Sequence, residues 1–141
     1  MKTMFPKAET VGFDAHSRVQ RVGRRHPYWP GWCGNWTTKY TGIPVLPSAF
    51  AEVTVSLYKT RRDALIAFGE PLFGSTRVLP NGVRMKTLVS TSSSSVASIV
   101  GNVFISSNGC CGPPPGYQGS KAVNAQIRIH RRIHAAILAV G

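Results

Sequence analysis

The chain has 141 residues, the usual size of one globular domain, and its hydrophobic content of 43% is ordinary for a folded protein. No apolar run approaches the roughly 18 residues that cross a bilayer, and no signal-peptide core follows Met1, so neither a transmembrane segment nor a leader is expected. Lysine and arginine number 17 against 5 acidic residues, which gives a formal net charge of +12. Such a charge indicates a polyanionic partner.

The basic residues outnumber the acidic ones most heavily in the second half of the chain, because no acidic residue follows Glu70. Arginine outnumbers lysine by 11 to 6, and a guanidinium can grip a phosphate through two hydrogen bonds. A solvated basic surface with no special partner is the alternative. The three cysteines include the adjacent pair Cys110 and Cys111, a pattern typical of free thiols in an intracellular, reducing compartment.

Residues 1–27 are predicted to form an extended basic arm that orders only on its partner. Pro6 and Pro27 interrupt the segment, and it has few large apolar side chains. Its candidate phosphate-binding residues are Lys2, Lys7, Arg18, Arg21, Arg24 and Arg25.

Residues 28–50 are predicted to form an aromatic, proline-rich interface loop, because interleaved glycine and proline argue against a regular element. All three tryptophans of the protein, Trp29, Trp32 and Trp36, lie in this segment. Their rings could stack on unpaired bases, or they could plug the edge of the core or a neighbouring subunit. Both interpretations place the segment at an interface.

Residues 51–141 are predicted to form a small α+β domain. Apolar and polar residues alternate from Ala51 to Tyr58, which predicts a half-buried strand. Thr60 and Asp63 then form a capping box ahead of a short helix that Gly69 ends. Arg61 and Arg62 fall in the first turn of this helix, where backbone amides also favour phosphate.

The next elements are predicted to be strands joined by turns. Asn81-Gly82 lies between two apolar runs and predicts a hairpin whose second strand places Arg84 and Lys86 on one face. The serine-rich tract 90–95 is expected to be a loop. Residues 96–105 are rich in β-branched side chains and predict a further strand, with a turn at Gly101-Asn102.

Residues 121–140 are predicted to form a long C-terminal amphipathic helix. On a helical wheel, one face gathers the apolar residues Val123, Ile127, Ile129, Ile133, Ile137, Leu138 and Val140. The other face gathers the basic residues, and the candidate phosphate contacts of this element are Lys121, Arg128, Arg131 and Arg132.

No catalytic motif and no cofactor fingerprint is present, so the chain is not expected to be an enzyme or to hold a cofactor. His130 and His134 lie four residues apart and could join Cys110 and Cys111 in a zinc site. Adjacent cysteines lack the usual ligand spacing, and the nearby arginines oppose a cation. The histidines are therefore expected to flank the basic face as polar or phosphate-contacting groups, with no metal.

The sequence thus predicts an α+β fold: a small antiparallel sheet, a short helix and a long C-terminal helix, preceded by a basic arm. The function that fits best is a structural RNA-binding subunit of a large ribonucleoprotein, of ribosomal or organellar-ribosomal type, contacting RNA and neighbouring protein subunits. A self-assembling viral or phage coat protein that packages nucleic acid is the first alternative. A peripheral, non-catalytic subunit of a membrane-bound complex is the second.

Overall fold

The computed structural model describes residues 4–22, 31–43, 46–69, 75–78, 84–89, 93–110 and 122–140. Within these ranges eight strands join in one antiparallel sheet, accompanied by a 3-10 turn and two α-helices. The mixed helix-and-sheet class is confirmed, although the sheet dominates. The elements are η2 Ala8–Val11, β1 Ala15–His16, β2 Gln20–Val22, β3 Trp32–Ile43, β4 Leu46–Tyr58, α1 Arg61–Gly69, β5 Ser75–Val78, β6 Arg84–Val89, β7 Ser93–Val100, β8 Val103–Cys110 and α2 Ala122–Val140.

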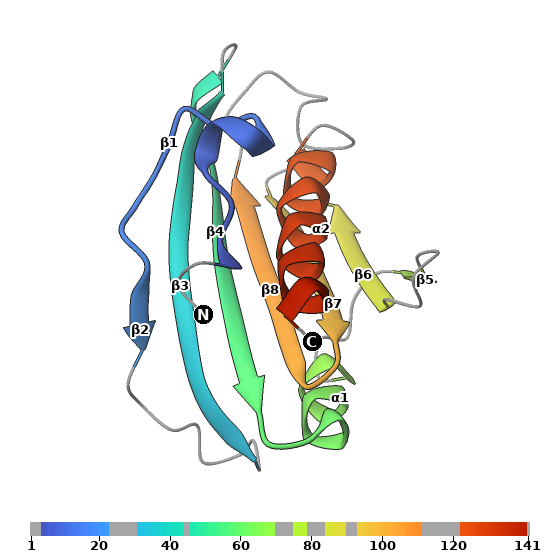
Figure 1. Cartoon of the computed structure of the whole chain (residues 1–141). Coiled ribbons are helices and arrows are strands. Elements are labelled where there is room, and N and C mark those ends of the chain that lie inside the picture. The colour runs from blue at the N-terminus through green and yellow to red at the C-terminus, as the bar shows by residue number, and fades with distance from the viewer. Residues whose placement is uncertain are drawn as a thin grey trace.

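The strands follow the order β1-β3-β4-β8-β7-β6-β5, and β2 also pairs with β3 (Figure 1). Residues alternate between the two faces along β4, as the sequence predicted. Val53 and Val55 enter a core with α2, whereas Tyr58 enters a second core with Ala64 and Phe68 of α1. The two helices therefore cover opposite faces, and α2 lies over β7 and β8.

The predicted interface loop at 28–50 is wrong for the residues that the structure describes, because 32–43 and 46–50 belong to the long strands β3 and β4. Glycines led to the error. The pairing of β3 with β4 shifts register between Trp32 and Gly34 and again between Thr41 and Ile43. Such bulges accept an extra residue without ending a strand, and Gly42 takes a φ of 77° at the second one.

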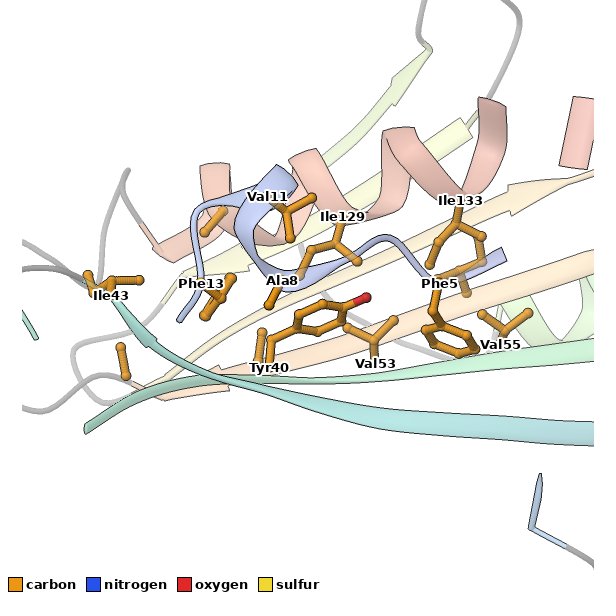
Figure 2. Packing of buried hydrophobic residues seen from close by; sticks show 14 of the residues in the cluster. Phe5, Ala8, Val11, Phe13, Tyr40, Ile43, Val53, Val55, Ile129 and Ile133 are labelled. Atoms are coloured by element: carbon orange, nitrogen blue, oxygen red, sulfur yellow. The ribbon is translucent and has the colours of Figure 1, made fainter. Parts of the chain in front are cut away.

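The predicted extended arm is also wrong for the described residues 4–22. Phe5, Val11 and Phe13 are buried in the core that β4 and α2 share, as Figure 2 shows. The Tyr40 hydroxyl donates a hydrogen bond to the Pro6 carbonyl at 2.7 Å, and β1 and β2 pair with β3. The segment carries few apolar residues, but they cover the part of the sheet beside α2.

The short helix and the hairpins follow their sequence signals more closely. The Asp63 amide donates to the Thr60 hydroxyl at 3.1 Å, and that hydroxyl donates to the Asp63 carboxylate at 2.9 Å, so the N-cap half of the predicted capping box is confirmed. β5 pairs with β6, although the Asn81-Gly82 turn lies outside the described residues. The expected loop at 90–95 is wrong from Ser93 onward, where β7 begins.

Candidate nucleic-acid interface

The outer face of α2 carries three exposed arginines: Arg128, Arg131 and Arg132. Residues three and four positions apart are neighbours on a helix surface, so these guanidinium groups share one face. The sequence of α2 contains no acidic residue to balance them. Like charges at this spacing destabilise a helix by about 0.2–0.5 kcal/mol per pair, and an anion bound across them removes that cost.

The inner face of α2 combines an apolar row with a polar one. Ala125, Ile129 and Ile133 are buried against the sheet in the core of Figure 2. The predicted apolar face is only partly correct, because Leu138 is 53% exposed and Val140 is 78% exposed. The buried arc is rotated toward Gln126, His130 and His134, which sequence reasoning had not placed in the core.

These three residues lie four positions apart and meet serines of β7 and β8; we call the set of Ser94, Ser98, Ser107, Gln126, His130 and His134 the polar ladder. The Ser98 hydroxyl lies 2.5 Å from His130 Nδ1 and 2.8 Å from His134 Nε2. The Ser107 hydroxyl lies 2.9 Å from His130 Nε2. The expectation that the histidines contact phosphate is wrong, because both are buried.

Burial also sets the protonation of the two histidines. It lowers the pKa of His130 to about 3, with a smaller contribution from the neighbouring His134 ring. Burial likewise lowers the pKa of His134 to about 4. Both rings are therefore neutral at pH 7, and they add nothing to the positive charge of the helix.

The remaining basic candidates do not gather around α2. The Arg21 guanidinium on β2 lies over the Trp36 ring, 5.5 Å from its centroid. Arg61 donates to the Gly101 carbonyl at 3.2 Å, and Arg62 is exposed beside it in the first turn of α1. The other described candidates, Lys7 before η2, Arg18 between β1 and β2, and Arg84 at the start of β6, are also exposed.

Several candidates fall outside the described structure: Lys2, Arg24, Arg25, Trp29 and Lys121. Lys86 has a backbone position in β6, and its side chain is not described. The predicted basic surface is thus supported only in the parts that the described ranges cover.

The two described tryptophans belong to the sheet. Trp36 is half-buried against the main core, and Trp32 is half-buried against the second core, where its indole N–H donates to Asn35 Oδ1 at 2.6 Å. The two rings therefore serve the protein's own packing, and Trp36 offers its outer face to the Arg21 guanidinium.

The basic side chains are not neutralised within the protein. Every described lysine and arginine side chain is exposed, and across the described ranges none lies within 4.0 Å of a carboxylate oxygen. The same ranges hold no group of three or more histidine, cysteine or acidic residues that could ligate a metal. The arrangement can attract phosphates; within those ranges it brings together no charged acid and base for proton transfer.

The sequence does contain a signal for the polar ladder that our prediction did not use. Gln126, His130 and His134 repeat every four residues beside the apolar row Ala125, Ile129 and Ile133. A polar row adjoining an apolar one predicts a buried polar network only when the opposing strand supplies hydroxyls, as the serine-rich β7 does.

Comparisons with known proteins identify no family. No family model matches the chain, and no curated protein sequence matches it. Among solved structures, the extracellular domain of PknH from Mycobacterium tuberculosis superposes with a TM-score of 0.52 at 9% identity, over 92% of this chain and 94% of that chain. Neither described helix is both long and apolar enough to cross a membrane. At this identity the likeness concerns the fold alone.

Proposed function

We propose that this protein is a non-catalytic RNA-binding subunit that contacts phosphates through exposed arginines, with the outer face of α2 as its principal contact. The observation that carries the proposal is the unneutralised charge: net +12, with every described basic side chain exposed and none paired with a carboxylate. Such a charge distribution repels itself and gains free energy when a polyanion displaces its counterions.

The positions of the cations favour a folded polymer over a flat surface. They occur on β2 at one edge of the sheet, in the first turn of α1 and on the outer face of α2 (Figure 1). A membrane plane could meet one of these regions at a time, whereas an irregular phosphate backbone can follow several.

Duplex DNA fits less well because α2 offers few groups that read bases. Gln126, whose amide could have paired with adenine, is buried in the polar ladder. Among the described residues of α2, only the exposed Asn124 and the three arginines could read base edges, so we expect the face to act chiefly through charge and bidentate phosphate contact.

The test compares two double variants that lose the same charge. Arg131→Ala/Arg132→Ala removes two cations from α2, whereas Lys39→Ala/Lys59→Ala removes two exposed cations located elsewhere. We expect the first variant to weaken binding to a structured RNA in a filter assay. Its log–log salt slope should be shallower by about 1.4–1.8, because each phosphate contact contributes about 0.7–0.9.

The charge-matched control should keep most of the wild-type affinity and slope. Equal losses in the two variants would reduce the interface to net charge, and the assignment to α2 would be wrong. Binding to anionic vesicles without binding to RNA would overturn the proposal in favour of a lipid surface. Regular shells or polymers of the purified chain in negative stain would favour the coat-protein alternative.

A further inference from the structure

The polar ladder has an unusual composition for a buried histidine site, because its partners are hydroxyls and an amide rather than carboxylates. The Ser98 hydroxyl is shared by His130 and His134, which lie one helical turn apart with ring centroids 6.3 Å apart. A hydroxyl has one proton to donate, so it can donate to one ring and must accept from the other.

With both rings neutral, the ladder forms one continuous chain of donors. His134 Nε2–H donates to Ser98, Ser98 donates to His130 Nδ1, and His130 Nε2–H donates to Ser107. The Ser107 hydroxyl then donates to Gln126 Oε1 at 2.7 Å, and the amide nitrogen of Gln126 donates to the Ser94 hydroxyl at 2.7 Å. The swapped orientation of the Gln126 amide satisfies both of its groups, because its nitrogen then donates to Ser107 and its oxygen accepts from Ser94 and the Gly109 amide. The chain then runs in the opposite direction, and Ser98 donates to His134 Nε2.

A proton added to His130 breaks this chain, and a proton added to His134 at Nδ1 creates a buried N–H without an acceptor. The doubly protonated His130 ring would need acceptors at both nitrogens, and the Ser98 hydroxyl would then accept from both rings and lose the partner for its own proton. The new charge would also be buried without a counter-ion, because His130 is 0% exposed. His134 Nδ1 already lacks a partner within the described structure, so the ladder holds no spare acceptor.

No described element that packs against this face of α2 supplies a compensating negative charge. The helix-facing residues of β7 and β8 are serine, valine, isoleucine and glycine, and those of β4 are alanine, valine and leucine. Met85 of β6 is apolar, and on β3 the Tyr40 hydroxyl is bound to the Pro6 carbonyl, burial raising its pKa. Glu9 and Lys7 of the N-terminal segment are exposed. The charged groups of α2 itself are Arg128, Arg131 and Arg132, all positive.

We propose that the polar ladder is an acid-sensitive latch: neutral His130 and His134 hold α2 on β7 and β8, and protonation of the two rings releases the helix from the sheet. A released histidine has an ordinary pKa near 6.5, so release takes up to two protons as the pH falls below about 6. The released helix carries its three arginines away from the sheet, so pH would control the position of the proposed RNA contact. RNA binding itself does not require this control.

The experiment is amide hydrogen exchange of the full-length chain between pH 7.5 and 4.5, corrected for the intrinsic exchange rate at each pH. We expect the protection factors of α2 amides to fall by up to about a hundredfold per pH unit, since opening is coupled to two protons. Amides in the β3–β4 hairpin should keep their protection to a lower pH, because the long backbone pairing of the two strands does not depend on the ladder, although α2 shares their core.

Two variants isolate the proton coupling. His134→Gln keeps an N–H donor near Nε2 and cannot titrate, so its α2 amides should lose protection by only about tenfold per pH unit, one proton fewer. His16→Gln changes an exposed histidine on β1 and should match the wild type. The slope of protection factor against pH gives the number of protons coupled to opening, and a pH-independent change in stability caused by the substitution does not alter this slope.

A measurement on the wild type keeps the inference testable if His134→Gln does not fold. In a histidine titration followed by nuclear magnetic resonance, the His130 and His134 resonances should not shift between pH 7.5 and 6.5. The proposal is overturned if the two buried rings titrate near 6.5 with α2 still protected. It is also overturned if α2 and β3–β4 amides lose protection together with one exponent, because the helix would then not be released as a unit.

Discussion

Replacing Ser98 with alanine should strongly destabilise the protein, because its hydroxyl, like that of Ser107, bridges two buried partners in the polar ladder. The hydroxyl bridges His130 Nδ1 at 2.5 Å and His134 Nε2 at 2.8 Å, so its loss leaves two buried nitrogens without a partner. Each unsatisfied buried group costs about 1–3 kcal/mol, which places the loss for Ser98→Ala at about 2–6 kcal/mol. Urea denaturation at pH 7.5, followed by circular dichroism, measures the change in the free energy of unfolding.

The matched control is Ser106→Ala on β8. Ser106 is half-buried on the opposite face of the sheet and takes part in no side-chain hydrogen bond among the described residues. Its replacement should change the free energy of unfolding by no more than about 0.5 kcal/mol. If Ser98→Ala proved as mild as Ser106→Ala, the ladder would contribute nothing to the docking of α2, and the reasoning from its hydrogen bonds would be refuted.

Three further predictions follow from named contacts. Burial lowers the pKa of His130 to about 3 and of His134 to about 4, so below pH 6.5 the unfolded chain binds more protons than the folded one. The free energy of unfolding should therefore fall by about 4 kcal/mol between pH 7.5 and pH 5. A urea midpoint that stays constant over this range would contradict the prediction. Thr60→Ala removes the capping hydroxyl of α1 and should cost about 1 kcal/mol in thermal or urea unfolding. Gly12→Ala should lower the free energy of unfolding by about 1 kcal/mol or more, because Gly12 has a φ of 85° and an added Cβ would lie 3.3 Å from the Arg128 side chain. In the same urea assay Gly69→Ala should be neutral or stabilising, because a Cβ there meets nothing within 4 Å.

Sequence reasoning succeeded where a local pattern determines the structure. The alternation from Ala51 to Tyr58 specifies a strand with one buried face, and β4 includes it. The Thr60 hydroxyl accepts from the Asp63 amide, so a local pattern marks the start of α1. Gly101, with a φ of 56°, permits the tight connection between β7 and β8.

Sequence patterns were insufficient where contacts between segments distant in the chain determine the structure. Residues 4–13 look like a polar arm because their apolar side chains, Phe5, Ala8, Val11 and Phe13, are few and irregularly spaced. They become core residues only because β3 and β4 extend beyond the width that α2 covers, which no local pattern reveals. Glycine in a long strand is equally ambiguous, since the bulge at Gly42 depends on the register of β4.

The candidate site divides in the same way. The exposed arginines of α2 follow from composition and helical spacing, and the structure leaves them exposed. The position of the histidines does not follow, because the same i, i+4 spacing suits a metal site, a phosphate contact or a buried network. What decides among these is the chemistry of the facing strands, and Ser98 and Ser107 supply hydroxyls where a ligand set would need a third metal-binding group.

The outer face of α2 carries charge of the same sign as the charge that protonation would add to the ladder. A proton on His130 or His134 would add to the three positive charges of Arg128, Arg131 and Arg132, although burial is the main cause of the low pKa of both rings. A polyanion bound across the arginines would screen that repulsion, so the rings would take up protons, and the helix would be released, at a higher pH. The latch and the basic face would then act through one helix, because a single charge balance governs both.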